Sequence, residues 1–260
     1  MKKQDRRHQL IADLLREREF VTTPELADAV GVSEVTLRRD LRHLELTGVL
    51  VRQHGGAQLA TGRLEVESRF AEREVLNSDV KAAIGARAAS LVDPEEHVAF
   101  NDGSTIMRVA ASLRDRNITL SATTNALNIA VTLSDSALID VWVLGGLVRR
   151  ASYATFNAVT DSFDGRRFDT AILGIESADD SGVALDHPYD LAIAKGMIER
   201  SERVIVVADS SKWRRRGKVE LCRWADVDIF VSDSISPEHH ALLTEQGVSI
   251  LLANPKETSE

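Results

Sequence analysis

The chain has 260 residues, of which 43% are hydrophobic and 28% charged, and its formal net charge at pH 7 is −8. This length suits one large domain, or a small domain followed by a medium one, and the apolar content is sufficient for an ordinary core. No apolar run approaches the roughly 18 residues of a membrane span, and the basic start MKKQDRRHQLIADLL lacks the apolar stretch of a signal peptide.

Cysteine content and charge distribution limit further which kind of protein this chain can be. Cys222 is the only cysteine, which excludes an internal disulfide and a cysteine metal cluster, so we expect a reduced, cytoplasmic setting and no cofactor. Residues 1–60 carry ten Lys and Arg against nine Asp and Glu, net +1, and the remainder carries 22 against 31, net −9. Whole-chain charge therefore argues neither for nor against nucleic-acid binding, and local patterning decides.

Residues 1–57 are predicted to form three helices and a hairpin. Leucine and isoleucine side chains at helical spacing indicate the first helix, at Leu10, Ile11, Leu14 and Leu15. Thr23 before Pro24 predicts the N-cap and first turn of the second helix.

The third helix is expected after a break at Gly31. Ser33 is its predicted N-cap, and Gly48 is predicted to end it. Its buried face is indicated by leucines spaced four and three apart, at Leu37, Leu41 and Leu44. The segment VLVRQHGG then predicts a short strand and a tight turn.

Residues 58–79 are polar, without a strong period, and are predicted to be a linker with some helix. From Val80 onward, helices alternate with short apolar strands. The predicted strands are HVAFND, ITLSATTN, VWVLGG, TAILGI, RVIVVAD, DIFVSD and VSILLA, and the predicted helices lie near 80–91, 105–114, 126–134 and 189–201. This alternation predicts a mostly parallel α/β domain over 80–260.

The N-terminal pattern is typical of a nucleic-acid reader. Two short helices joined by a tight turn, the second presenting side chains outward, make a helix-turn-helix, and the following hairpin would form a wing. An arginine-rich helix face is more often only a solvated surface, but here turn, cap and wing occur in the required order. The candidate DNA-binding residues are Thr23, Ser33, Glu34, Thr36, Arg38, Arg39, Arg42, Arg52 and His54.

Small or polar groups follow several of the predicted strands. They occur at 101–105, 124–125, 145–146, 174 and 209–212. Because the carboxyl ends of parallel strands share one sheet edge, these loops are expected to converge on a cleft. The DGST segment before a helix would offer backbone N–H groups and hydroxyls to a phosphate, and Lys212 a positive charge. Taken singly, each loop is as well explained as a turn, a helix cap (Asp209) or an exposed basic loop.

The segment TTPELADAVGVSEVTLRRDLRHLELTGVLVRQHGGA resembles the winged helix-turn-helix of the DeoR family of bacterial transcription regulators. The matching motifs are Val32-Ser33, Arg38-Arg39-Asp40-Leu41 and Arg52-Gln53-His54-Gly55-Gly56-Ala57, with Leu37 in place of the usual isoleucine. The resemblance continues through DGST, TTNALNIA, VLGG, FDTAILGI and VVADSSKW and so covers nearly the whole chain.

This resemblance implies a Rossmann-like α/β sensor domain similar to ribose-phosphate isomerases and coenzyme A transferases, with a phosphorylated sugar or sugar-derived metabolite as effector. The family's phosphate-loop glycine and hydroxyls correspond to Gly103, Ser104 and Thr105, its asparagine after the second strand to Asn125, and its late lysine to Lys212. The candidate effector-binding residues are Asn101, Asp102, Gly103, Ser104, Thr105, Thr124, Asn125, Gly145, Gly146, Glu176, Asp190 and Lys212.

Several positions depart from the family pattern. Asn101 replaces the usual aspartate, Asn157 replaces a glycine, and Asp190 with Lys195 stands where a glutamate and a lysine are usual. Loss of a carboxylate at Asn101 would remove a charged acceptor for a sugar hydroxyl. We therefore expect an effector unlike those of the best-known members.

The leading interpretation is a ligand-responsive transcription factor, a repressor of a carbohydrate-utilisation operon, acting as a homodimer or homotetramer on operator DNA. An alternative is a sugar-phosphate isomerase fused to a DNA-binding head, using Asp102, Glu176, Asp209 or Lys212. The acidic, glycine-rich catalytic stretch of such isomerases is not recognisable in the sequence. A purely architectural DNA-binding protein would not need the acidic α/β domain.

Overall fold

The computed structural model divides the chain into two compact units, Met1–Arg69 and Phe70–Glu260. The division falls inside the predicted linker. The residues that the structure does not describe are 1–6, 9, 12–13, 16–17, 19, 47–49, 54, 60–73, 75, 150–151, 157–162, 215–216 and 254–260. Gly48, His54 and Asn157, all discussed above, lie outside the described residues.

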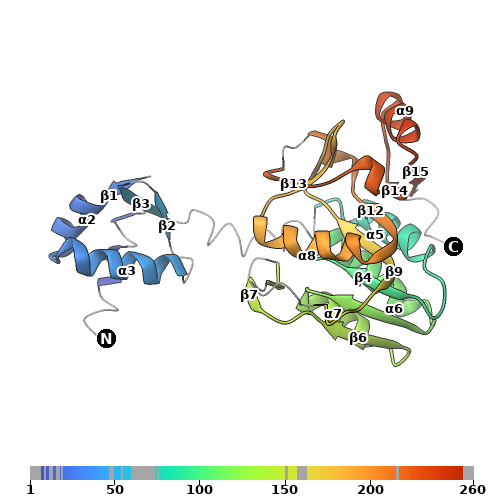
Figure 1. The fold of residues 1–260 in the computed structure, drawn as a ribbon, viewed down its shortest axis with the longest axis horizontal. Helices are drawn as coiled ribbons and strands as arrows, with labels where there is room; N and C mark the ends of the chain where they lie inside the picture. The colour runs from blue at the N-terminus through green and yellow to red at the C-terminus, as the bar shows by residue number, and fades with distance from the viewer. Residues whose placement is uncertain are drawn as a thin grey trace. The chain divides into compact units, whose positions relative to one another are not determined.

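The N-terminal unit combines helices with a small antiparallel sheet (Figure 1). Its described helices are α2 (Thr23–Val30) and α3 (Glu34–Leu46), preceded by helical residues Arg7, His8, Leu10, Ile11, Leu14 and Leu15. Strands β1 (Val21–Thr22), β2 (Leu50–Gln53) and β3 (Gly56–Leu59) pair in the order β1-β3-β2. The predicted helices and hairpin are therefore present, and the hairpin extends to residue 59, two residues into the predicted linker.

The start of α2 differs from the prediction by one residue. The N-cap is Thr22, not Thr23: its hydroxyl accepts a hydrogen bond from the Glu25 N–H at 3.4 Å, and the Glu25 carboxylate accepts from the Thr22 N–H at 3.0 Å. This reciprocal capping box requires a threonine three residues before the glutamate, which only Thr22 satisfies. Pro24 lies in the first turn as predicted.

The two glycines after His54 meet different requirements. Gly55 has φ of 84°, a left-handed conformation that favours glycine. Gly56 lies in β3 opposite Thr22 of β1, and a Cβ atom there would come within 2.4 Å of the Val21 carbonyl oxygen. Gly56 therefore lets β3 pack closely against β1.

The C-terminal unit is built on a parallel sheet of seven strands. These are β4 (His97–Phe100), β5 (Leu120–Thr124), β6 (Ile139–Val143), β9 (Phe168–Gly174), β12 (Ser201–Val207), β14 (Ile229–Ser232) and β15 (Ser249–Leu252). Their order is β15-β14-β12-β9-β4-β5-β6, and every neighbouring pair is parallel. The seven strands correspond one to one with the seven predicted segments, which confirms the α/β fold class.

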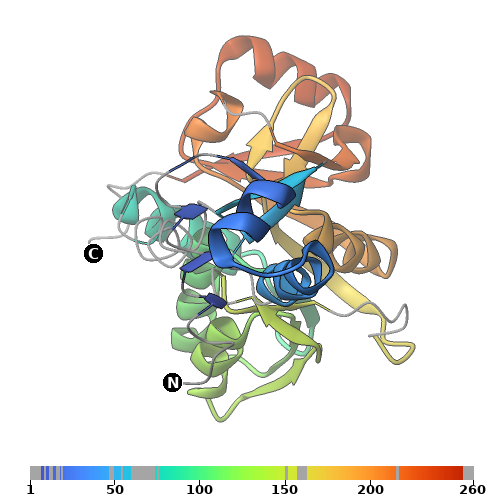
Figure 2. The ribbon, with the colours of Figure 1, turned by 90° about the vertical axis from the view of Figure 1, so that its left-hand side faces the viewer.

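Helices cover both faces of this sheet (Figure 2). One face packs against α5 (Ser78–Ala89), α6 (Ser104–Asp115) and α7 (Leu127–Ser134), and the other against α8 (Pro188–Glu199) and α9 (Pro237–Glu245). In β12, Ile205 joins the first core and Val206 the second. This alternation explains the continuous apolar runs in the central strands β9 and β12, since both faces of these strands are buried. Helices α5 to α8 begin and end within two residues of their predicted bounds.

Smaller elements surround the sheet. Strands β10 (Ser177–Ala178), β11 (Gly182–Leu185) and β13 (Val219–Arg223) form an antiparallel sheet, and β7 (Leu147–Arg149) pairs with β8 (Ala154–Phe156). The 3-10 helices are η1 (Ser210–Arg214) and η2 (Trp224–Asp226). None of these elements, nor α9, was predicted. Within the described part of the chain, no helix is both long and apolar enough to cross a bilayer.

Candidate functional site

The helix α3 presents a polar face to solvent. Its leucines Leu37, Leu41 and Leu44 are buried in the core of the N-terminal unit, as predicted. The opposite face exposes the predicted DNA-contacting residues Glu34, Thr36, Arg38, Arg39 and Arg42. The helix therefore offers a row of arginines while its leucines hold it in place.

The N-terminus of α3 is capped by Ser33, as predicted. The Ser33 hydroxyl accepts a hydrogen bond from the Thr36 N–H at 3.3 Å and lies 3.0 Å from the Thr36 hydroxyl. Both side chains are exposed, so hydroxyls and free first-turn N–H groups face outward together. Such a helix terminus suits a backbone phosphate.

Asp40, the acidic residue of the RRDL motif, has a structural role. Its side chain is 3% exposed, and its carboxylate accepts hydrogen bonds from Arg7 Nε at 2.6 Å and Arg7 Nη2 at 3.0 Å. His8 Nε2 lies 3.1 Å from the same carboxylate. Burial opposes ionisation of this carboxyl, but the hydrogen bonds from Arg7 and His8 outweigh it and lower the pKa of Asp40. Asp40 therefore ties the first helical segment to α3.

The remaining nucleic-acid candidates lie at the start of α2 and on the wing. Thr23 is the first residue of α2 and is half-buried. Arg52 lies on β2 with its side chain exposed. His54 is outside the described residues.

The C-terminal unit contains a polar pocket where the strand order reverses. From β4 the chain proceeds to β5 and β6 on one side of the sheet, then to β9, β12, β14 and β15 on the other. In parallel α/β sheets, ligands bind at the carboxyl ends of the strands at such a switch point. A cavity with about 660 Å³ of empty space, part of it open to solvent, is lined there by Asn101, Asp102, Gly103, Ser104, Thr105, Arg149, Ser152, Gly174, Ile175, Glu176, Leu185, Asp186, Asp190 and Lys212.

One wall of the pocket is the N-terminus of α6. Its N-cap is Gly103, with φ of 141°, and no side chain caps the helix. The first-turn N–H groups therefore lack a side-chain acceptor, and the hydroxyl side chains of Ser104 and Thr105 lie beside them in the lining. Backbone donors, hydroxyls and the positive end of the helix dipole together form an anion cradle.

The side-chain amide of Asn101 is occupied by the backbone of β9. Its Nδ2 donates to the Gly174 carbonyl oxygen at 2.9 Å, and its Oδ1 accepts from the Gly174 N–H at 2.8 Å. A carboxylate could accept from this N–H but could not donate to the carbonyl. The asparagine in place of the family's usual aspartate therefore joins β4 to β9, and Asn101 supports the pocket rather than presenting a free acceptor.

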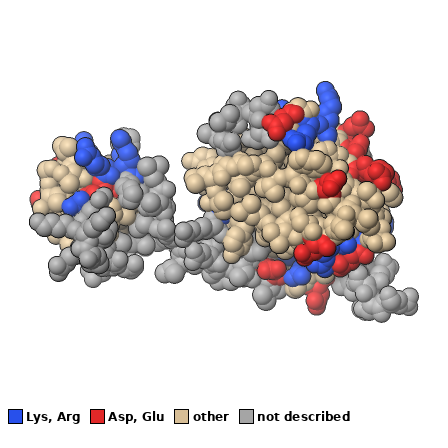
Figure 3. Space-filling model, turned by 90° about the horizontal axis from the view of Figure 1, so that it is seen from below, with Lys and Arg blue, Asp and Glu red and all other residues tan. Residues whose placement is uncertain are grey.

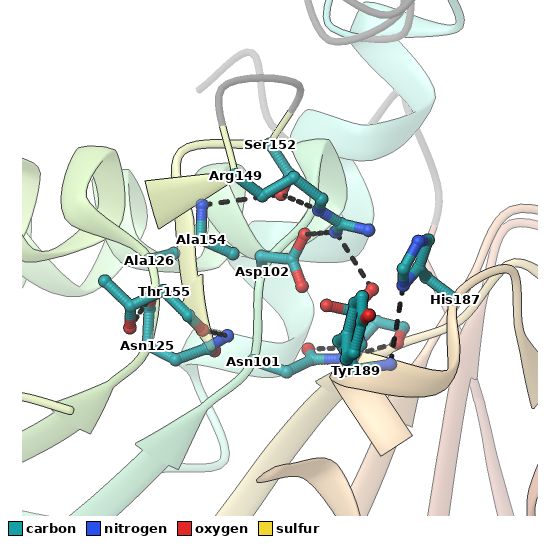
Figure 4. Close-up of polar contacts among 12 residues, drawn as sticks. Asn101, Asp102, Asn125, Ala126, Arg149, Ser152, Ala154, Thr155, His187 and Tyr189 are labelled. Carbon is teal, nitrogen blue, oxygen red and sulfur yellow. Dashed lines mark hydrogen bonds and ion pairs between the residues drawn. The ribbon is translucent and has the colours of Figure 1, made fainter. Parts of the chain in front are cut away.

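Arg149 pairs with two carboxylates of the pocket lining, and its contact with one of them, Asp102, is seen in Figure 4. Its Nη2 lies 3.1 Å from Asp102 Oδ2 and 2.9 Å from Asp190 Oδ2, and its Nε donates to the Ser152 hydroxyl at 3.0 Å. Burial, with the nearby charge of Asp102, raises the pKa of Asp190 to about 7, although Arg149 opposes the shift. The charge of Asp190 therefore changes near neutral pH.

Lys212 supplies the second cation of the pocket lining. The residue is 9% exposed, and its Nζ lies 3.2 Å from Glu176 Oε2. Asp209 does not line the pocket; its carboxylate accepts hydrogen bonds from the Ser211 N–H and hydroxyl at the start of η1. Asp209 therefore has the capping role considered as the simpler interpretation of its sequence position.

Four predicted effector residues do not line the pocket. Asn125 is held by β8: its side-chain Nδ2 donates to the Thr155 carbonyl oxygen at 3.1 Å, and its backbone carbonyl accepts from the Thr155 N–H at 2.6 Å. Thr124 is fully buried, and its hydroxyl accepts from the Ala126 N–H. Gly145 and Gly146 form the exposed turn between β6 and β7. The β7–β8 hairpin covers this part of the sheet edge, so the strand ends that reach the pocket are those of β4, β9 and β12.

The sequence prediction missed the pocket residues Arg149, Ser152 and Asp186. Arg149 stands in the segment LVRR, and neither charge nor spacing distinguishes it from a solvated arginine. Only the folding back of the β7–β8 hairpin brings it to Asp102. Among the described residues, no group of three or more His, Cys, Asp or Glu side chains is arranged to hold a metal ion.

Both units match known protein families. The DeoR-like helix-turn-helix domain matches residues 7–63, and the DeoR C terminal sensor domain matches residues 76–234. The chain is similar to the glycerol-3-phosphate regulon repressor of Haemophilus influenzae, at 31% identity over 98% of this chain and 99% of that protein. It is also similar to the HTH-type transcriptional regulator GlpR of Haloferax volcanii, at 31% identity over 94% of this chain and 96% of that protein. The HTH-type transcriptional repressor GlcR of Bacillus subtilis is 28% identical over 98% of each chain.

Proposed function

Because this chain belongs to the DeoR family of transcriptional regulators, we propose that it represses a carbohydrate-utilisation operon and is released by a phosphorylated sugar or sugar-derived metabolite. The similar relatives include repressors named for the glycerol-3-phosphate regulon and for the lactose phosphotransferase system. In this proposal the N-terminal unit binds the operator, and the effector changes the population that is competent to bind DNA.

We expect Arg38→Ala to weaken operator binding by about 1–3 kcal/mol, roughly 5- to 150-fold, if Arg38 contacts a base. The Arg38 side chain is 67% exposed and forms an exposed i,i+4 pair with Glu34 at 3.1 Å. Such pairs contribute little to stability, so thermal unfolding should be nearly unchanged. Fluorescence anisotropy with labelled operator measures the effect.

The matched control for this substitution is Arg114→Ala. Arg114 also forms an exposed pair, with Asp115 at 2.8 Å, but it lies on α6 in the other unit. Its removal should leave operator affinity within error of the parent. Equal losses in both variants would mean that Arg38 acts only through the net charge of the chain.

The observation that carries the effector proposal is the uncapped N-terminus of α6 at the switch point of the sheet. Gly103, Ser104 and Thr105 would hold the phosphate, with Lys212 adding a positive charge. Asp102, Glu176 and Asp186 supply carboxylate acceptors suited to the hydroxyls of a sugar.

A thermal-shift screen with phosphorylated sugars and polyols tests the effector proposal, because a ligand that binds only the folded state raises its apparent stability. We expect a phosphorylated compound to stabilise the C-terminal unit and its unphosphorylated parent compound to have no effect. A screen in which phosphorylated and unphosphorylated compounds behave alike would contradict the proposed phosphate site.

The raised pKa of Asp190 predicts pH-dependent effector binding. Below pH 7 this carboxyl becomes protonated, and the pocket loses one negative charge facing the phosphate. Affinity for a phosphosugar should therefore rise as pH falls from 8 to 6. The ligand's own phosphate titrates near pH 6 as well, so the parent must be compared with Asp190→Asn by calorimetry. The variant should bind more tightly than the parent at pH 8 and similarly at pH 6; identical pH profiles would contradict this role.

We also propose that the chain assembles as a homodimer or homotetramer through its C-terminal unit. Helix-turn-helix proteins generally read two half-sites with two copies of the recognition helix. Operator repeats would then be separated by whole helical turns of DNA.

The isomerase alternative has little support from the geometry. An isomerase needs a base available beside the substrate. Of the candidates, Asp209 caps η1, Asp102 is paired with Arg149, and Glu176 lies against Lys212. The relatives reported above are transcriptional regulators, and measurable conversion of ribose 5-phosphate by the purified protein would be needed to revive this alternative.

A further inference from the structure

The exposed apolar side chains of the described residues are concentrated at one edge of the seven-stranded sheet. Thirteen large hydrophobic residues are exposed, and seven of them lie between 131 and 153: Val131, Leu138, Trp142, Val143, Leu147, Val148 and Tyr153. We define the edge patch as Leu138, Trp142, Val143, Leu147 and Val148, which come from β6, β7 and the turn before β6. Exposed apolar patches of this kind mark interaction sites.

The chain around the edge patch is almost uncharged. Residues 117–148 contain no Lys, Arg or Glu and only two carboxylates, Asp135 and Asp140. In a protein with 28% charged residues, such a stretch is not an ordinary solvated surface. Figure 3, which views this edge, shows a broad uncharged area on the C-terminal unit with acidic and basic residues toward its rim.

Strand β6 leaves one side of its backbone available for pairing. It is the last strand of the sheet and pairs with β5. The Leu138 carbonyl and the Leu144 N–H both bond toward β5, so strand alternation turns the N–H and C=O groups of Val141 and Val143 outward. Within the described part of the chain, no strand lies on that outer side. The strand also contains no proline or lysine, the residues that usually prevent edge pairing.

We propose that the edge patch is the interface with a second copy of this chain. Strand β6 would pair antiparallel with β6 of the partner subunit about a two-fold axis at Val141. The outward-facing groups of Val141 and Val143 then complete a ladder across the axis, and the side chains of the edge patch are buried against their symmetry equivalents. A two-fold interface requires one patch to be self-complementary, which an edge strand achieves by antiparallel pairing.

Charge complementarity supports this pairing and fixes its register. With Val141 on the axis, Asp140 lies opposite Trp142 of the partner subunit, on the same face of the sheet. The Arg166 guanidinium stands 5.4 Å from the centroid of the Trp142 ring within each chain. Each Asp140 would therefore approach Arg166 of the partner subunit, and symmetry provides the contact twice.

The inference specifies the oligomer proposed above, and its test uses neither DNA nor effector. Sedimentation equilibrium of the parent should give a dimer, or a tetramer built from such dimers. Val143→Glu, which places a carboxylate in the edge patch, should halve that mass. The matched control is Leu252→Glu on β15, the opposite edge of the sheet, where the leucine is 52% exposed against 43% for Val143; it should keep the parent's mass.

The outcome of this test is decisive in either direction once circular dichroism shows that both variants are folded. Retention of the parent's mass by Val143→Glu, or its loss in Leu252→Glu, would overturn the proposal. A parent that is monomeric at tens of micromolar would also overturn it, and would leave the edge patch to another occupant, such as a different protein. Operator binding and effector binding would remain open to their own tests.

A charge exchange tests the register independently. Asp140→Arg and Arg166→Glu each create two repulsive contacts in their own homodimer, so each should raise the dimer dissociation constant about tenfold or more. In a mixture of the two variants, the heterodimer has two attractive contacts, and a dissociation constant close to that of the parent should return. If either substitution only disturbed its own subunit locally, mixing the two variants would not restore association. Failure of the mixture to associate would therefore overturn the proposed pairing.

Discussion

Replacement of Asp40 by alanine is expected to unfold the N-terminal unit and abolish operator binding, while the C-terminal unit retains its stability. The substitution leaves the Arg7 guanidinium and the His8 ring without the carboxylate that joins them to α3. Removing one partner of a buried ion pair costs about 3–5 kcal/mol. A unit of this size rarely has more than about 3–5 kcal/mol of stability, so the loss is comparable to the whole. Scanning calorimetry should show loss of the transition assigned to this unit.

The controls for Asp40→Ala separate folding from DNA contact. Arg38→Ala should reduce operator affinity without changing the calorimetric transition, whereas Asp40→Ala should remove both together. The pH dependence provides a second check, because Asp40 has a lowered pKa in the folded state. Its contribution is therefore present above the ordinary carboxyl pKa and is lost as the pH falls through the lowered folded value. A folded, operator-binding Asp40→Ala protein would show that the contacts to Arg7 and His8 are incidental.

The sheet could be predicted because its strands are buried on both faces. Continuous apolar runs such as those of β9 and β12 leave little ambiguity once helices alternate with them. The order of the strands was not predictable in the same way. Strand β4 pairs with both β5 and β9, and this pairing depends on tertiary packing rather than on local sequence. It creates the switch point and the pocket there.

The β7–β8 hairpin shows where prediction from sequence fails. Its strands have three residues each, and in β7 two of the three are exposed. They therefore carry no periodic burial signal. The hairpin nevertheless removes Asn125 from the cleft and brings Arg149 into it. Several strand ends do converge on the pocket, but the prediction included more strand ends than reach it.

Asn101 and Asp40 illustrate a second limit of prediction from sequence, because the fold gives each residue a role that its sequence position does not indicate. Asn101 was interpreted as a lost sugar ligand, but its amide pairs with both backbone groups of Gly174. Asp40 was identified only as part of a DNA-binding motif, but its carboxylate binds Arg7 and His8 and so stabilises the N-terminal unit. The hydrogen-bond partner of Asp40 lies 33 positions away along the chain, and that of Asn101 lies 73 positions away. The local sequence pattern therefore could not identify either partner.

Lys212→Ala is expected to abolish the response to effector while operator binding persists. Arg149, the other cation of the pocket lining, pairs with two carboxylates, Asp102 and Asp190, whereas Lys212 pairs with Glu176, so we expect Lys212 to be the cation that holds the phosphate. Truncating one partner of a buried charged contact costs about 2–5 kcal/mol, which corresponds to roughly 30-fold or more in affinity.

The Lys212→Ala prediction is measured by calorimetric titration with the phosphosugar found in the screen, and by release of the protein from labelled operator. The matched control is Lys218→Ala, an exposed lysine six positions further along the chain that does not line the pocket. It should bind effector like the parent, which removes a general effect of net charge from the comparison. If effector released the Lys212→Ala protein from operator as it releases the parent, the ligand would bind elsewhere. Lys212 is 9% exposed and lies in the pocket wall, so its removal should weaken binding of any phosphate in this pocket.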